Sequence, residues 1–251
     1  MASGEQNRLH REVVSFVRRS ARMTTSQLKA WQRWAPHLVV PIATGETSTS
    51  VAPQRVPDWD AVFGRRAPII VEIGSGTGDS LVPMAAARPE CNVVAFEVFE
   101  PAVASTLGRM ARHEPPVDNV RVVLADGAQG LSHLFEPGQI SELWTFFADP
   151  WHKARHHKRR LVGPDLAATV ARQLSPGAHW FLATDWQDYA EWMREVLDDA
   201  PDLVNAHAAT GGWAPRLQAR PLTKYERRGL HAGRQIHDLE YMVAEPPGAG
   251  S

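Results

Sequence analysis

Ile69-Ile70-Val71-Glu72-Ile73-Gly74-Ser75-Gly76-Thr77-Gly78 is the stretch of sequence that decides the fold. Its apolar half predicts a short buried strand, and its alternating glycines predict a tight turn into a helix. Farther along the chain, apolar runs that predict strands alternate with segments that predict helices. The expected strands are 93–96, 121–125, 141–147, 179–184, 202–208 and 237–244, and the expected helices are 79–88, 100–113, 161–174 and 187–199. This alternation predicts an α/β fold with a doubly wound, mostly parallel sheet of seven strands.

Composition narrows the class of protein. Of the 251 residues, 43% are hydrophobic and 22% are charged, values typical of a globular chain. The single cysteine, Cys91, excludes an intramolecular disulfide and a cysteine-based zinc cluster. No apolar run is long enough to span a membrane, and the polar N-terminus lacks the apolar core of a secretory signal. We therefore expect a cytoplasmic protein that does not enter a membrane.

Positive charge is concentrated in three segments, although the formal net charge is only −1. Residues 1–34, 151–160 and 216–234 each carry a net charge of +5, whereas the rest of the chain is strongly acidic. Any one such run is most simply a solvated surface. Three basic segments on an acidic body are typical of a protein that holds a polyanion against one face, so the charge pattern favours a nucleic-acid partner.

Acidic residues follow three successive predicted strands. Glu72 lies at the end of the first strand, Glu97 ends the second, and Asp126 follows the third. Because the carboxyl ends of parallel strands meet at one edge of a sheet, these acids are expected to face one crevice, where doubly wound sheets bind ligands. Asp79 stands where a dinucleotide fingerprint needs glycine. The E-x-G-x-G-x-G pattern instead resembles the S-adenosylmethionine site of Rossmann-like methyltransferases, with Gly74 and Gly76 in the turn.

The segment Phe146-Phe147-Ala148-Asp149-Pro150-Trp151-His152-Lys153 and the basic run after it carry a more specific signal. Residues 146–162 resemble the signature of the bacterial tRNA (guanine-N(7)-)-methyltransferases. Residues 14–24 resemble that family's N-terminal basic motif, and residues 223–229 resemble its C-terminal T-K-F/Y-E-x-R-G element. The resemblance spans residues 13–243, with Ala148 standing where the family usually has proline.

The resemblance implies a class I, S-adenosylmethionine-dependent enzyme that methylates N7 of a guanine in the variable loop of tRNA. It assigns four carboxylates to cofactor contact: Glu72, Glu97, Asp126 and Asp149. It assigns a second set to the tRNA substrate: Lys153, Asp185, Thr223, Lys224, Tyr225 and Glu226. It places a third set on the RNA backbone: Arg155, His156, His157, Lys158, Arg159 and Arg160.

Asp149 is the candidate catalytic residue. Proline after it restrains its backbone and holds the carboxylate at the mouth of the crevice. N7 of guanine carries a lone pair and no proton, so a strong general base is not required. The methylated base becomes cationic, and a nearby carboxylate would favour that charge. Trp151 is the tryptophan expected near a base.

The sequence leaves several alternatives open. His152 and His156 have the spacing of zinc ligands on a helix, but the surrounding cations repel a metal and attract phosphate, so no metal is expected. Asp149-Pro150-Trp151 also resembles the D-P-P-Y/W element of amino-methyltransferases acting on exocyclic amines of RNA or DNA. A non-catalytic RNA-binding protein on the same fold is a further alternative.

The expected organisation is a basic extension and loop over residues 1–60, a methyltransferase domain over 61–245 and a frayed tail over 246–251. Residues 41–58 are rich in Pro, Ser, Thr and Gly and predict a loop. Within the extension, the partly apolar segment 13–17 predicts a short helix. The expected partner is tRNA, and the chain is expected to act as a monomer or a homodimer.

Overall fold

The protein folds around one seven-stranded sheet, which we describe from a computed structural model over residues 22–245. The predicted helix at 13–17, most of the basic motif at 14–24 and the tail at 246–251 lie outside the described residues. The strands are β1 (Ile69–Ile73), β2 (Asn92–Glu97), β3 (Val120–Leu124), β4 (Ile140–Phe146), β5 (Leu174–Thr184), β6 (Leu203–Asn205) and β7 (His237–Val243). Their order across the sheet is β3-β2-β1-β4-β5-β7-β6.

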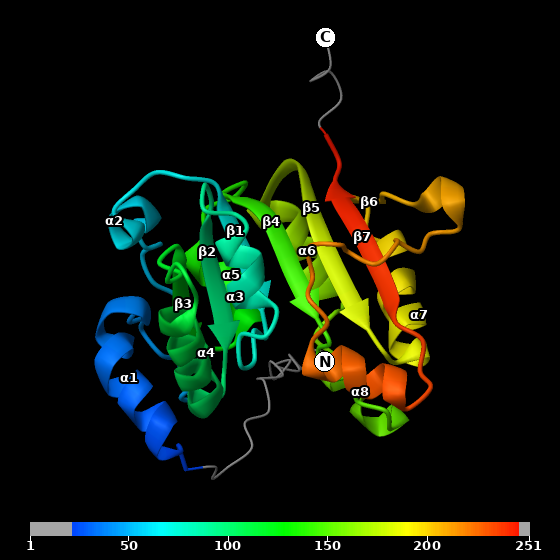
Figure 1. Cartoon of the computed structure of the whole chain (residues 1–251). Helices are drawn as coiled ribbons and strands as arrows, with labels where there is room; N and C mark the ends of the chain where they lie inside the picture. The colour runs from blue at the N-terminus through cyan, green and yellow to red at the C-terminus, as the bar shows by residue number, and fades with distance from the viewer. Residues whose placement is uncertain (1–21, 246–251) are drawn as a thin grey trace, which may run out of the picture.

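The first five strands are parallel, and β7 enters antiparallel between β5 and β6. This arrangement confirms the predicted mostly parallel, seven-stranded sheet. It also brings the carboxyl ends of β1, β2, β4 and β5 to one edge, which is where α8 lies (Figure 1). The acids that follow these strands in the sequence therefore converge on that edge.

Helices cover both faces of the sheet (Figure 1). One face carries α1 (Thr25–Leu38), α3 (Leu81–Ala86) and α4 (Glu100–Arg112), and the other carries α5 (Gly127–Leu134), α6 (Pro164–Gln173) and α7 (Gln187–Asp198). The remaining helical segments are α2 (Trp59–Phe63), η1 (Ala154–Arg159), η2 (Ala208–Thr210) and α8 (Lys224–His231). All five residues of β1 are buried, with Ile70 and Val71 in the clusters on opposite faces.

Four helices and part of one strand were not expected from the sequence. These helices are α1, α2, α5 and α8. No residue of α1 is fully buried, and the helix is tied to α4 by Gln27 Nε2, which donates to the Pro101 carbonyl at 3.0 Å. β5 begins at Leu174 rather than near 179, because Pro176 and Gly177 suggest a loop but lie within the strand.

Among residues 22–245, no helix has both the length and the apolar character needed to cross a membrane.

Replacing Gly130 with alanine tests how closely α5 packs on the sheet. A Cβ at Gly130 would lie 2.1 Å from Cε1 of Phe96, a fully buried ring on β2. Alanine in a helix usually stabilises by up to about 1 kcal/mol over glycine, but overpacking a core costs about 1–3 kcal/mol, so we expect net destabilisation. Urea unfolding measures the difference.

The matched control for this prediction is Gly163→Ala, because a Cβ at Gly163 meets nothing within 4 Å. The control should change the free energy of unfolding by less than about 1 kcal/mol. A Gly130→Ala protein as stable as the wild type would show that α5 can move away from Phe96 without cost.

Candidate functional site

The glycine turn after β1 forms one wall of the site. Gly74, Gly76 and Gly78 have φ angles of 78°, 55° and 74°. These angles lie in the left-handed region that disfavours residues with a Cβ. A Cβ at Gly74 or Gly76 would meet nothing within 4 Å, so backbone conformation rather than space requires glycine at both positions. The turn therefore leaves open room beside its backbone at the carboxyl edge of the sheet.

Glu72 supplies a buried carboxylate directly beneath this turn. Its exposed fraction is 1%, and its Oε1 accepts a hydrogen bond from Ser80 Oγ at 2.9 Å. Its Oε2 is buried and has no hydrogen-bond partner among residues 22–245. Burial raises the pKa of Glu72 to about 7, and the Glu97 charge adds to this rise. A cationic donor placed beside Oε2 would satisfy this oxygen and favour the ionised form.

Glu97, at the end of β2, forms hydrogen bonds with both the glycine turn and the turn that follows its own strand. Its Oε2 accepts from the Gly76 amide at 2.8 Å, and its Oε1 accepts from the amides of Val98 and Phe99 at 2.8 and 2.9 Å. Burial raises the pKa of Glu97 despite these bonds, and the Asp149 charge raises it further. A carboxylate oxygen has two acceptor positions, so Oε2 keeps one for a ligand.

Asp126, which follows β3, is the third acid expected at this edge of the sheet, and it lies at the start of α5. Its Oδ1 accepts from the amides of Ala128 and Gln129 at 3.0 and 3.1 Å, which makes Asp126 the N-cap of α5. The carboxylate is 3% exposed, at the end of the strand beside Glu97. The residue therefore has a structural role in addition to its place in the crevice.

The turn that carries Asp149 is strained. The backbone of Phe147 has φ 55° and that of Trp151 has φ 47°, and of the residues that the structure describes these are the two non-glycine residues with positive φ. Such conformations cost on the order of 1 kcal/mol or more and concentrate at functional sites. Burial raises the pKa of both Glu97 and Tyr225, and the Asp149 charge adds to both rises.

Most of the basic run expected to contact RNA lies on η1 at this edge. Arg155, Lys158 and Arg159 are exposed, whereas His156 and His157 are half-buried. The guanidinium of Arg159 lies 5.1 Å from the ring centroid of Trp151. The last residue of the run, Arg160, directly follows η1 and differs from the others because it is buried.

Arg160 was expected on the RNA backbone, and the structure shows its side chain buried. Its side chain is 2% exposed. Its Nε donates to the Pro150 carbonyl at 3.1 Å, and its Nη2 binds the Asp188 carboxylate on α7. The guanidinium is thus turned into the protein and does not face solvent, where a phosphate would approach.

Desolvation and the neighbouring cations, Arg159 foremost, lower the pKa of His156. The cation-rich environment therefore favours the neutral imidazole. Among residues 22–245, no three His, Cys, Asp or Glu side chains are arranged to hold a metal ion.

The predicted substrate residues on α8 fall into two groups. Lys224 Nζ donates to Thr77 Oγ1 of the glycine turn at 3.0 Å. The Tyr225 side chain is half-exposed, and partial burial together with the charges of Glu97 and Asp149 raises its pKa. In contrast, Thr223 is the buried N-cap of the helix, and Glu226 is 1% exposed. Lys224 and Tyr225 thus face the crevice, whereas Thr223 and Glu226 hold α8 in place.

Two further predicted residues border the crevice. Lys153 is exposed directly before η1. Asp185, after β5, accepts both Nε and Nη2 of Arg234 on its Oδ2 at 2.8 Å. A Cβ at Gly229 of α8 would come within 2.8 Å of the Asp185 side chain, so α8 lies directly against this acid.

Arg220 is a key residue that the sequence analysis missed, because it was counted within a basic segment expected at the surface. Its side chain is fully buried, and its Nη1 and Nη2 bind the two carboxylate oxygens of Asp238 at 2.5 and 3.2 Å. Its guanidinium lies 5.2 and 5.4 Å from the ring centroids of Phe146 and Phe147. Its Nε lies 3.5 Å from Glu226. Arg220 therefore connects β7, α8 and the strand end that leads to Asp149.

Glu226 completes this cluster. It accepts from Nε and Nη2 of Arg216 at 2.6 and 3.0 Å. Burial alone would raise its pKa, but Arg216 and Arg220 lower it overall. Three arginines of the basic segment 216–234 therefore form ion pairs within the protein: Arg216 with Glu226, Arg220 with Asp238, and Arg234 with Asp185.

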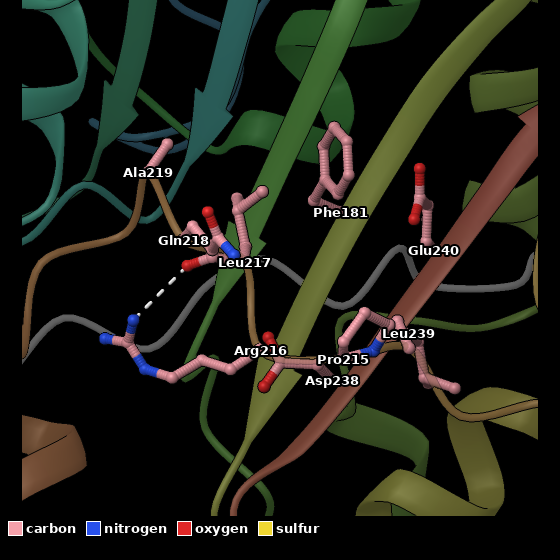
Figure 2. Close-up of a pocket in the computed structure, with 10 residues that line it drawn as sticks. Phe181, Pro215, Arg216, Leu217, Gln218, Ala219, Asp238, Leu239 and Glu240 are labelled. Carbon is pink, nitrogen blue, oxygen red and sulfur yellow. Dashed lines mark hydrogen bonds between the residues drawn. The ribbon is translucent and has the colours of Figure 1, made fainter.

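The structure also has two hollows lined by residues of the C-terminal half of the chain. A cavity of about 320 Å³ lies between β5 and β7 and the segment Ala214–Ala219 that crosses them (Figure 2). In Figure 2, Arg216 donates to the Leu217 carbonyl at the rim of this cavity. A second hollow of about 570 Å³ lies beside Trp186 and Arg234. Neither is lined by Glu72, Glu97 or Asp149, although Asp185 and Asp188 line the second.

Known proteins resemble this chain closely. A protein-family profile described as a putative methyltransferase matches residues 66–239. The tRNA (guanine-N(7)-)-methyltransferase of Cutibacterium acnes (strain DSM 16379 / KPA171202) is 52% identical over 94% of this chain and 84% of that protein. The protein of the same name from Nocardioides sp. (strain ATCC BAA-499 / JS614) is 48% identical over 92% of this chain and 87% of that protein.

Solved structures agree on the fold. The 16S rRNA methyltransferase KamB has a TM-score of 0.50 and 19% identity, covering 81% of this chain and 99% of that one. The antibiotic-resistance methyltransferase Kmr has a TM-score of 0.50 and 16% identity, covering 82% of this chain and 99% of that one. At these identities the likeness shows a shared class I methyltransferase fold.

Glu72→Gln should stabilise the ligand-free protein in a pH-dependent way. The folded-state pKa of about 7 exceeds the ordinary value of 4.5, so the folded protein holds a proton that the unfolded chain releases. Wild-type stability should therefore fall as pH rises through this window, whereas the glutamine variant should not show this loss. We expect the variant's advantage to approach about 3 kcal/mol at pH 8 and to vanish near pH 4.5.

Urea unfolding across a pH series measures this advantage. Glu195→Gln, which changes an exposed glutamate on α7, is the control and should track the wild type at every pH. An advantage that is constant with pH would show that Glu72 is ionised in the folded protein throughout the range.

Proposed function

The chain belongs to the tRNA (guanine-N(7)-)-methyltransferase family, and we propose from this premise that it transfers a methyl group from S-adenosylmethionine to N7 of a guanine in tRNA. One observation of the structure carries the proposal. Glu97 accepts from the Gly76 amide of the glycine turn, Glu72 has a buried oxygen without a partner among residues 22–245, and Lys224 of the basic helix α8 donates to Thr77 of the same turn. A cofactor crevice and a polyanion-binding face therefore meet at one edge.

The residues around the turn fit S-adenosylmethionine. Glu72 has a buried, unpartnered oxygen suited to the cationic amino-acid part, and Glu97 keeps one acceptor position suited to a ribose hydroxyl. The open backbone at Gly74 and Gly76 allows a ligand to approach closely. Asp126 would border the adenine. When bound, the cofactor supplies a methyl group on a sulfonium sulfur, which is an electrophile ready for displacement.

The protein's task in the reaction is positioning and charge stabilisation. Methyl transfer would need the chain to hold guanine with its N7 lone pair facing the methyl carbon, and the electron pair of the broken carbon–sulfur bond would remain on sulfur. No proton moves, so Asp149 is not needed as a base. Positive charge grows on the guanine ring as the bond forms, and the Asp149 carboxylate stabilises it electrostatically. Tyr225, half-exposed beside Asp149, offers an aromatic surface for the base.

We assign tRNA to the face made by η1 and α8. Exposed cations on η1 and the preceding turn provide phosphate contacts: Lys153, Arg155, Lys158 and Arg159. His156 and His157 contribute hydrogen bonds, and Lys224 links this face to the glycine turn through Thr77. Asp185 keeps acceptor positions for the substrate because both Arg234 nitrogens bind its Oδ2. Thr223 and Glu226 act by holding α8 at the crevice.

The proposal also covers the target base, the cellular location, the oligomeric state and the metal requirement. The target is the guanine of the tRNA variable loop, the enzyme acts in the cytoplasm as a monomer or homodimer, and it needs no metal. The alternatives are methylation of an exocyclic amine and RNA binding without catalysis.

The decisive experiment is incubation with unmodified tRNA and S-adenosylmethionine carrying a labelled methyl group, followed by nucleoside analysis. We expect the label in 7-methylguanosine. Label on an exocyclic amine would indicate an amino-methyltransferase. Absence of label in the presence of tight tRNA binding would indicate a non-catalytic RNA-binding protein.

Asp149→Asn should lower the single-turnover rate of methyl transfer by about 10²–10³, the usual range for losing one electrostatic stabiliser. The affinity for tRNA should change little, because a carboxylate does not attract phosphate. Raising the pH should not restore the rate, because N7 has no proton to remove. Single-turnover rates across a pH series test both points. A variant that regains activity at high pH would contradict the assignment and indicate base catalysis.

Arg155→Ala combined with Lys158→Ala should weaken tRNA binding and flatten its salt dependence. Each lost phosphate contact lowers the slope of log K against log salt concentration by about 0.7–0.9. S-adenosylmethionine affinity should stay at the wild-type value. Filter binding at several KCl concentrations measures the slope, and an unchanged slope would remove η1 from the tRNA face.

A further inference from the structure

Arg160 ends a basic run, but its guanidinium is enclosed by protein. Its Nε donates to the Pro150 carbonyl at 3.1 Å, and its Nη2 binds the Asp188 carboxylate. Its guanidinium carbon lies 5.2 Å from the ring centroid of Tyr189 and 5.6 Å from that of Trp192. The side chain is 2% exposed. A planar, five-donor cation stacked on aromatic rings and bonded in two directions is immobilised.

The bond to Pro150 reaches the candidate catalytic turn. Pro150 lies between Asp149 and Trp151, and its carbonyl belongs to the peptide plane that leads into Trp151. The backbone of Trp151 has φ 47°, a conformation that a non-glycine residue keeps only when its surroundings enforce it. Arg160 supplies a restraint at that peptide plane and anchors it to α7 through Asp188.

We propose that Arg160 is a positioning residue for methyl transfer, acting together with Asp188: it holds the Asp149-Pro150-Trp151 turn in its strained conformation and does not bind RNA phosphate. This inference rests on the proposed function. Arg160 acts through the Pro150 carbonyl on the placement of the Asp149 carboxylate. A displacement of about 1 Å at a reacting centre can lower a rate by about 100-fold.

The two roles for Arg160 predict opposite effects of changing Asp188. If Arg160 bound phosphate, removing the competing Asp188 charge would free the guanidinium and tighten tRNA binding. If Arg160 positions the turn, Asp188→Asn loosens the anchor and lowers the rate. Asp188 is 59% exposed, so asparagine keeps its shape without burying a new polar group.

The test uses the full-length chain and begins with the wild type. Formation of 7-methylguanosine by the wild type establishes the activity, and its absence would refute the proposed function before any variant is made. Single-turnover rates at saturating tRNA, tRNA affinity against KCl concentration and Tm are then measured for Arg160→Ala, Arg160→Lys, Asp188→Asn and the Arg160→Lys/Asp188→Asn double variant.

We expect Arg160→Lys and Asp188→Asn each to lower the rate by about 10- to 100-fold. Lysine keeps the charge but lacks the planar guanidinium that binds Pro150 and Asp188 at the same time, and asparagine removes the charge that holds the guanidinium. The double variant should be little slower than Arg160→Lys alone, since both changes break one linkage. The slope of tRNA affinity against salt should remain that of the wild type. Lys158→Ala is the control and should lower that slope by about 0.7–0.9.

Three results would overturn the inference. The first is a wild-type rate in Arg160→Lys together with a flattened salt slope in Arg160→Ala, which identifies a phosphate contact. The second is tighter tRNA binding at an unchanged rate in Asp188→Asn. The third is a rate loss in Asp188→Asn that is matched by a large fall in Tm, which indicates a general contribution to stability. If Arg160→Ala does not fold, Arg160→Lys and Asp188→Asn decide the matter.

Discussion

A single buried guanidinium, that of Arg220, connects the parts of the site. It binds both oxygens of Asp238 on β7, lies 3.5 Å from Glu226 on α8 and stacks on Phe146 and Phe147. A buried charge is tolerated only when it is paired, and removing one partner costs about 3–5 kcal/mol. The antiparallel strand β7, the helix α8 and the end of β4 are therefore held in one fixed relation.

The crevice itself concentrates negative charge at a cost to stability. Glu72 is buried and Glu97 is half-buried, and burial raises the pKa of both carboxylates; the Glu97 charge adds to the rise at Glu72, and the Asp149 charge adds to the rise at Glu97. The backbone amides around Glu97 offset part of this cost, but Oε2 of Glu72 remains without a partner among residues 22–245. A cationic cofactor and a base that becomes cationic would both relieve this repulsion, which explains why such a costly arrangement suits the proposed chemistry.

Sequence patterns predicted the central sheet well, because buried parallel strands such as β1 and β2 are short apolar runs ending at functional residues. They did not predict α1 or α8. No residue of α1 is fully buried, and the buried residues of α8 are Glu226 and Gly229, neither of which has an apolar side chain. Both helices are stabilised by caps and by tertiary contacts, such as Gln27 to Ser105 at 2.9 Å.

By itself, the sequence determined the order of strands and helices, the glycine turn and the row of acids at the strand ends. These features depend on local conformation and on the rule that parallel strands end at one edge. Only the tertiary structure decided which charges face solvent. Lys158 and Arg160 are two positions apart in one basic run, yet one is exposed and the other is buried against Asp188. Both side chains are cationic, and their different burial is set by packing partners far away in the chain, such as Asp188 and Trp192 for Arg160.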